Sequence, residues 1–331
     1  MKYCAILAIL ILTGASPVLA DGGHHHEVPT LSAKTKTVVT MKDQTLTVTF
    51  GPIDLPVGHS GDLAASMPKH TFELPEDMYL VGYKANVYLQ DGTPLPQQYL
   101  HHILLMDNNK ESVSCPGEPQ FFAGAGMEMT EARFPKGYGV KLGKGHKLTA
   151  LVAFYHKVPP TRNVMASFTM QIAPKGSHVE PMEVYQVGVN IVCFSKFGKR
   201  AKDETDEGML IRPGVDVRSA PLKFSMDGCT KFAYPHGHDQ LLLIALENIT
   251  TGKTLLRTVP DVALDGAFKA FQPHQVYKNA AGFAVNTRDE YVMTMVHHKA
   301  LDDKREQYGM GNYLMYMTPG PCPSDQSAST R

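Results

Sequence analysis

The chain has 331 residues, 43% of them hydrophobic, which is enough to bury the cores of two domains of ordinary size. Its 32 Lys and Arg residues balance its 32 Asp and Glu residues, so no basic field is present to attract nucleic acid or an anionic membrane surface. We therefore expect no nucleic-acid partner. The 15 His and 17 Met residues, with no Trp, favour imidazole and thioether ligands, which suit copper in its two oxidation states.

Residues 1–20 predict a secretory signal peptide, because Lys2 is followed by an apolar run and by a small-residue cleavage pattern before Asp21. No later stretch approaches the roughly 18 apolar residues that span a bilayer. We expect an exported protein, secreted or periplasmic, without a membrane span. The segment 21–34 that follows carries three histidines at positions 24–26 and is more typical of a flexible terminus than of a metal site.

Short β-branched and alternating runs begin after residue 35 and predict strands rather than helices. In chain order we expect strands at 37–40, 45–50, 79–89, 100–106, 139–142, 147–155 and 164–172. Turn signals such as Asp91-Gly92 and Pro159-Pro160 separate them. These strands form a predicted N-terminal domain over residues 35–178, and the Pro- and Gly-containing stretch 173–181 is the expected connection to a second domain.

A second series of short strands forms the predicted C-terminal domain, residues 183–318. Its expected strands are 183–194, 222–226, 231–238, 241–246, 253–259, 282–285, 291–296 and 312–317. A polar stretch at 198–208 predicts an exposed loop, and the tail 319–331 is predicted to be disordered after Cys322. We therefore predict an all-β fold: two tandem jelly-roll-like β-sandwich domains with a cleft between them.

Four cysteines remain after the predicted signal peptide: Cys115, Cys193, Cys229 and Cys322. An even number in an exported chain favours disulfides, and no Cys-x-x-Cys occurs. The sequence by itself leaves three pairings open.

The segment around His236 and His238 has the spacing of half a metal site, because alternate side chains of an extended strand point to the same side. Taken alone, this spacing is also compatible with a surface strand that carries two histidines. Met310 would complete the site, and its thioether favours Cu(I), whereas zinc rarely accepts such a ligand.

The adjacent residues His101 and His102 predict a second site. On a regular strand they would face opposite sides, so binding one ion requires a kinked backbone or the use of different ring nitrogens. The alternative is that one ring is buried and the other exposed. His156, at the end of a strongly apolar strand, would complete a three-imidazole site that suits Cu²⁺ or Zn²⁺ equally well.

The remaining histidines have no spacing that matches a site. His146, His178, His274, His297 and His298 are therefore expected to have ordinary solvated or supporting roles.

Four motifs in this order resemble the type II copper, ascorbate-dependent monooxygenases, the family of peptidylglycine α-hydroxylating monooxygenase and dopamine β-monooxygenase. The motifs are His101-His102 before apolar residues, Pro135-Lys136-Gly137 leading to His156, His236-Gly237-His238, and Met310-Gly311-Asn312. The resemblance covers about residues 74–317 and fills all of the family's copper-ligand positions with the right residue types.

The resemblance implies two copper ions per chain, in separate domains that face each other across a solvent-filled cleft. It implies that His101, His102 and His156 hold the electron-transfer copper. It further implies that His236, His238 and Met310 are catalytic and hold the copper at which O₂ and substrate react. Ascorbate is the implied reductant, and the implied reaction is hydroxylation of a substrate C–H bond.

The chain departs from the family at the implied substrate site. Members that take peptides carry an arginine at the position of Tyr234, and tyrosine cannot make arginine's bidentate pair with a carboxylate. Asn312 does match an asparagine near that site, so Tyr234 and Asn312 are the candidate substrate-binding residues for a small-molecule or peptide-like substrate. The resemblance also implies a Cys229–Cys322 disulfide, which leaves Cys115 to pair with Cys193.

These observations predict an exported copper-dependent monooxygenase. The alternative is a non-catalytic copper-binding or copper-handling protein on the same scaffold, since ligands can persist after substrate contacts are lost. A third hypothesis, an adhesion or carbohydrate-binding module, would leave the ordered set of ligands unexplained.

Overall fold

A computed structural model describes residues 30–55, 69–155, 158–189, 191, 193, 204–205, 208–237, 240–262, 268–270 and 275–323. These residues form β-strands joined by turns, with one turn of 3-10 helix, η1 (Gln97–Tyr99). The predicted all-β fold is therefore confirmed. The predicted signal peptide and the histidines at 24–26 lie outside the described residues, as do His156, His238 and His274.

The N-terminal half of the protein contains two sheets that pack face to face. Sheet 1 has the order β1–β2–β10–β4–β8–β11, with β7 paired to β4. Its strands are β1 (Thr30–Lys42), β2 (Thr45–Leu55), β4 (Met78–Leu89), β7 (Glu131–Arg133), β8 (Tyr138–Leu142), β10 (Thr161–Ile172) and β11 (Glu180–Pro181). Sheet 2 contains, in order, β3 (Lys69–Glu73), β9 (Lys147–Phe154), β5 (Leu100–Glu111) and β6 (Pro119–Gly126). Buried side chains from both sheets form one continuous core.

The C-terminal half contains a second pair of sheets. Sheet 3 contains, in order, β12 (Glu183–Gly188), β24 (Gly311–Pro319), β16 (Gly228–Gly237) and β21 (Tyr277–Val285). Sheet 4 contains β15 (Gly214–Leu222), β22 (Tyr291–Lys299), β17 (Leu241–Asn248) and β18 (Lys253–Thr258). Two small sheets are formed by β13 (Glu204–Thr205), β14 (Gly208–Leu210) and β23 (Tyr308–Gly309), and by β19 (Asp261–Val262) and β20 (Phe268–Ala270). A separate core joins sheets 3 and 4.

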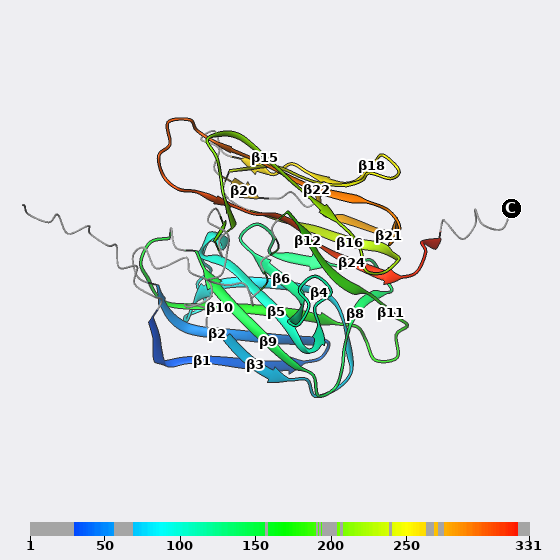
Figure 1. Ribbon diagram of the computed structural model, residues 1–331. Coiled ribbons are helices and arrows are strands. Elements are labelled where there is room, and N and C mark those ends of the chain that lie inside the picture. Colours follow the sequence, from blue (N-terminus) through cyan, green and yellow to red (C-terminus); the bar gives the residue numbers. More distant parts are fainter. Residues whose placement is uncertain are drawn as a thin grey trace, which may run out of the picture.

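Sheet 3 lies in the middle of the molecule, between sheet 4 and the N-terminal half (Figure 1). Nearly every residue of β16 and β24 is buried, because successive side chains enter two different cores. One face contributes Phe232, Tyr234, Leu314 and Tyr316 to the core of the N-terminal half. The other face contributes Ala233, Tyr313, Met315 and Met317 to the core of the C-terminal half.

Tyrosine hydroxyls fix sheet 3 to the edge strand β6. Tyr234 donates to the carbonyl of Gly124 over 2.9 Å, and Tyr316 donates to the carbonyl of Phe122, also over 2.9 Å. The hydroxyls of Tyr316 and Tyr83 are 3.0 Å apart. Edge carbonyls of β6 that face no strand partner are thereby satisfied inside the contact between the halves.

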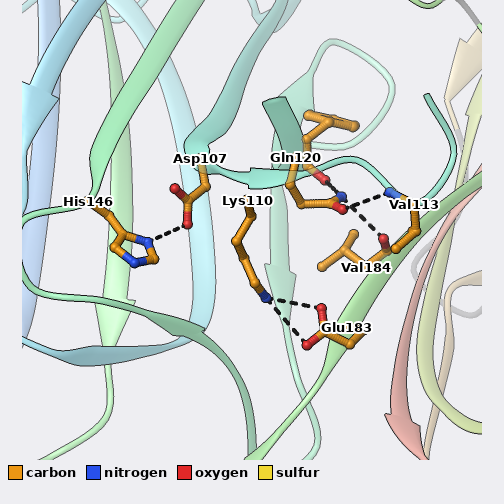
Figure 2. A network of polar contacts seen from close by, with 8 residues as sticks. Asp107, Lys110, Val113, Gln120, His146, Glu183 and Val184 are labelled. Carbon is orange, nitrogen blue, oxygen red and sulfur yellow. Dashed lines mark hydrogen bonds and ion pairs between the residues drawn. The ribbon is translucent and has the colours of Figure 1, made fainter. Parts of the chain in front are cut away.

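Charged and amide side chains extend this contact (Figure 2). Nζ of Lys110, on β5, lies 3.0 Å from Oε2 of Glu183, at the start of β12. Nε2 of Gln120, on β6, donates to the carbonyl of Val184 over 3.2 Å. The two halves are thus linked by strand β12 as well as by the tyrosines.

Two disulfides confirm the pairing that the family resemblance implied. Cys115 pairs with Cys193, which joins the loop after β5 to the segment after β12 and so links the two halves. Cys229 pairs with Cys322, which joins β16 to the residues after β24. Disulfides are typical of proteins that mature in an oxidising compartment.

Within the described residues, no helix has the length and apolar character needed to cross a membrane.

Several elements differ from the sequence-based expectation. Strand β1 begins at Thr30, within the segment that was expected to be flexible, and β3, β6 and β7 were not predicted. The strand expected at 222–226 is instead β15, which ends at Leu222. The expected strand 183–194 is shorter, since β12 ends at Gly188. The expected loop at 198–208 includes the short strand β13, which pairs with β14.

Candidate metal centre

His101 and His102 lie at the start of β5 with their ring centroids 4.4 Å apart. A regular strand would direct the two rings to opposite faces. The pairing of β5 with β9, however, has a register irregularity between Leu100 and His102. This irregularity is one of the two ways in which adjacent histidines can serve one site, and the two rings lie side by side.

His236, near the end of β16, faces this histidine pair from the other half of the protein. Its ring centroid lies 6.3 Å from that of His102, with the two rings nearly perpendicular. The family resemblance implied a solvent-filled gap between the two centres. At this point the halves are instead in contact, and imidazoles from both halves form one cluster.

Glu128 is the partner of His236, and the sequence did not single it out. Oε1 of Glu128 lies 2.5 Å from Nδ1 of His236. Burial alone would raise the pKa of this carboxyl, but the charge and hydrogen bond of His236, with a further contribution from His102, hold its pKa below the ordinary value. An ionised Glu128 therefore accepts a hydrogen bond from Nδ1–H and leaves Nε2 of His236 as the nitrogen available to a metal ion.

Glycine at position 126 allows this arrangement. A β-carbon at Gly126 would clash with the carbonyl oxygen of His101 and would lie 2.9 Å from Oε2 of Glu128. Strand β6 can therefore approach the strand that carries the histidine pair only because this residue has no side chain. The sequence signal for Glu128 was weak: an acidic residue separated by one methionine from an Ala- and Gly-rich run.

Met310 lies between β23 and β24 and is buried. The register of β16 and β24 pairs Gly237 with Gly311, so Met310, the residue before Gly311, lies beside the end of β16. Consistent with this placement, a β-carbon on Gly237 would lie 2.8 Å from the carbonyl oxygen of Met310. The sheet register thus brings two distant motifs to one end of sheet 3.

The two remaining predicted ligands, His156 and His238, lie outside the described residues. Their chain neighbours are described: the ring of Tyr155 lies 6.1 Å from that of His101, and Gly237 ends β16.

The candidate substrate-binding residues are both buried. Tyr234 donates its hydroxyl to Gly124 and belongs to the contact between the halves. Asn312, on β24, lies opposite His236 of β16 on one side and opposite Gly188 of β12 on the other, as strand partners in sheet 3. Tyr234, which stands where peptide-hydroxylating members of the resembled family carry an arginine, therefore joins the two halves of this protein.

Two further histidines have defined surroundings. His297, on β22, is buried with its ring against Gly309, and burial lowers its pKa to about 4, so it is neutral at neutral pH. His146 precedes β9, at the end of that strand remote from Tyr155, and its Nδ1 lies 2.7 Å from Oδ2 of the buried Asp107 (Figure 2). His178 and His298 are exposed, as expected.

Cys115, Glu118 and Cys193 also lie close together among the described residues. The two sulfur atoms form a disulfide, so this cluster offers no thiolate to a metal ion.

No family model matches the chain, and no curated protein matches it. Solved structures with a similar arrangement include PNGF-II, with a TM-score of 0.42 at 8% identity, covering 87% of this chain and 66% of the other. The recombinant N-glycanase F (PNGase F) aligns with a TM-score of 0.38 at 8% identity, covering 84% and 97%. The major capsid protein P2 from bacteriophage PM2 aligns with a TM-score of 0.35 at 9% identity, covering 81% and 97%.

Proposed function

We propose that this protein is an exported copper-dependent monooxygenase that hydroxylates a substrate C–H bond, using O₂ and electrons from ascorbate or a similar reductant. The observation that carries the proposal is the meeting of His101, His102 and His236, three predicted copper ligands from motifs far apart in the sequence. The order of the motifs along the chain supports the same function.

The residues present suit copper. Imidazole nitrogens from both halves and the thioether of Met310 are ligands that stabilise both oxidation states of the metal. Bound copper would supply one-electron redox chemistry. Glu128 would keep His236 in the tautomer that offers Nε2, and the close contact between the halves would limit access of water to the histidine cluster.

Copper content and oxygen consumption test this proposal directly. We expect about two copper ions per chain in the wild type, and about one in Met310→Ala, because the thioether is a ligand of only one ion. Ascorbate-dependent O₂ uptake should be lost in the same variant. Met41→Ala is the matched control, since Met41 is exposed on β1. A wild-type protein that binds one copper ion or none would contradict the proposal.

Tyr234 favours a second candidate function, copper binding without turnover. Its hydroxyl donates a hydrogen bond to the carbonyl of Gly124. The position that binds substrate in peptide-hydroxylating members of the resembled family is therefore used here for a contact between the two halves. A copper-handling protein would bind copper and exchange it with a chelator, but would show no ascorbate-linked O₂ uptake with any substrate tested.

A further inference from the structure

A pocket of about 400 Å³ opens between the two halves, beside the histidine cluster. Residues 127–133, which connect β6 to β7 and include β7, form its N-terminal wall. Phe232 on β16, with Val276 and Lys278 near the start of β21, forms the opposite wall. A pocket of this size can hold a small organic molecule.

Glu128 belongs to both the pocket and the candidate metal centre. It lines the pocket, and its Oε1 accepts the hydrogen bond from Nδ1 of His236. A single side chain therefore separates a molecule in the pocket from a predicted copper ligand. Met127, which also lines the pocket, donates its backbone N–H to the carbonyl oxygen of His101 over 3.4 Å.

Part of the pocket wall is apolar. Met129 and Val276 pack against the core of the N-terminal half, and Phe232 belongs to that core. Burial of a hydrocarbon or aromatic group against these side chains would be favourable in proportion to the apolar area removed from water.

The charged groups of the pocket are not all paired with one another. Glu128 is paired with His236, and Oε1 of Glu131 lies 3.4 Å from Nε of Arg133. Within the described part of the chain, the side chain of Lys278 makes no hydrogen bond or ion pair. The register of β16 and β21 places Lys278 directly opposite Phe232, so its ammonium group and the apolar surface lie on the same face of sheet 3.

We propose that this pocket binds the substrate, and that the substrate has an apolar body and a carboxylate or similar anionic group held by Lys278. This inference rests on the proposed monooxygenase function, for which it names the substrate class. Tyr234 removes the cation found at that position of β16 in peptide-hydroxylating relatives. Lys278 supplies a cation from β21, the strand next to β16, to a ligand smaller than a peptide.

Binding of anilinonaphthalene sulfonate, a fluorescent dye with an aromatic body and one negative charge, tests the pocket without copper. The copper-free wild-type protein should bind the dye with enhanced fluorescence. Val276→Asp and Lys278→Glu should each weaken binding about tenfold or more, a change of about 1.4 kcal/mol. Lys253→Glu is the control, because it makes the same charge change at an exposed site on β18 in sheet 4.

Competition against the dye tests the substrate class. Phenylpropionate, phenylpropanol and phenylpropylamine share one apolar body and differ only in the charge of the end group. In the wild type, phenylpropionate should displace the dye at a concentration about tenfold lower than the alcohol, and the amine should be the weakest. In Lys278→Glu, the preference for the carboxylate should disappear.

Equal displacement by the three compounds in the wild type would overturn the inference, and so would dye binding that is unchanged in both pocket variants. Failure of the proposed function is distinguishable from these results. A chain that binds phenylpropionate selectively but takes up no copper would have the anion pocket and would not be the proposed monooxygenase. A chain with full copper content and dye binding unaffected by the pocket variants would reject this pocket alone.

Discussion

Glu128 and His236 form a hydrogen bond of 2.5 Å between the two halves of the protein. The carboxylate comes from the segment after β6, and the imidazole comes from β16. Both side chains are largely shielded from water, with exposed fractions of 6% for Glu128 and 19% for His236. The orientation of a predicted copper ligand therefore depends on the docking of the halves. Substitutions in either half that alter this docking should change copper affinity.

Glu128→Gln should weaken copper binding at the His236 site by about 10- to 100-fold, the usual effect of losing the partner of a ligating histidine. The amide keeps the size of the side chain but no longer provides a negatively charged acceptor for Nδ1–H. Copper affinity, measured by competition with a chelator, checks this result. Glu131→Gln is the matched control, because Glu131 is nearby and exposed, and its carboxylate pairs with Arg133. Equal affinity in the two variants would contradict the role assigned to Glu128.

Gly309→Ala should destabilise the protein by about 1–3 kcal/mol, the usual cost of overpacking. The added methyl group would clash with Nε2 of His297, whose ring is buried against Gly309. Urea unfolding of the copper-free protein measures the change in the free energy of unfolding.

A double-mutant cycle separates this clash from backbone effects at Gly309. If the methyl group clashes with the imidazole, Gly309→Ala should cost at least about 1 kcal/mol less in a His297→Ala background. An identical cost in both backgrounds would show that the two residues do not interact, and would place the strain elsewhere in the segment before Met310.

Much of the fold followed from short-range patterns. Alternating and β-branched runs predicted most of the strands of sheets 1, 3 and 4. The even number of cysteines predicted disulfides, and two disulfides are present. The register irregularity at His101-His102 corresponds to one of the two alternatives that the sequence left open, a kinked backbone or the use of different ring nitrogens.

Strand β6 could not be predicted in this way. Its centre is rich in Ala and Gly, which are poor strand formers, so local preference argues against a strand. The strand exists because β5 pairs with it on one side and the hydroxyls of Tyr234 and Tyr316 bond to its carbonyls on the other. Glu128 was missed for the same reason: its partner, His236, is brought to it only by the docking of sheet 3.

Cys229→Ser should lower the free energy of unfolding by about 2–5 kcal/mol, as expected for loss of a native disulfide. The bridge to Cys322 joins β16, which carries His236, to the end of β24, which follows Met310. Thermal unfolding without reductant measures the loss. In the presence of a strong reductant, wild type and variant should converge. A wild-type melting temperature already equal to that of the variant under oxidising conditions would contradict the prediction.

Asp216→Asn should destabilise the protein at neutral pH and have a smaller effect in acid. Nε of Arg218 donates to Oδ1 of Asp216 over 2.9 Å, and the backbone N–H of Arg212 donates to Oδ2 over 3.0 Å. Burial acts to raise the pKa of this carboxyl, but these bonds and the two arginine charges hold the pKa below its ordinary value. A depressed pKa in the folded state means that the stabilisation is complete above the ordinary pKa and is lost as the pH falls through the folded-state value.

Urea unfolding at two pH values checks this linkage. At about pH 7 we expect the free energy of unfolding of Asp216→Asn to be about 1.5–3 kcal/mol lower than that of the wild type, the range for hydrogen bonds to a charged group. At about pH 3 the difference in the free energy of unfolding should be smaller. Asp302→Asn is the control, because Asp302 is exposed near the end of β22. If Asp216→Asn costs the same at both pH values, the hydrogen bonds stabilise the neutral and the ionised side chain equally. The stability of sheet 4 would then not depend on the ionisation of Asp216.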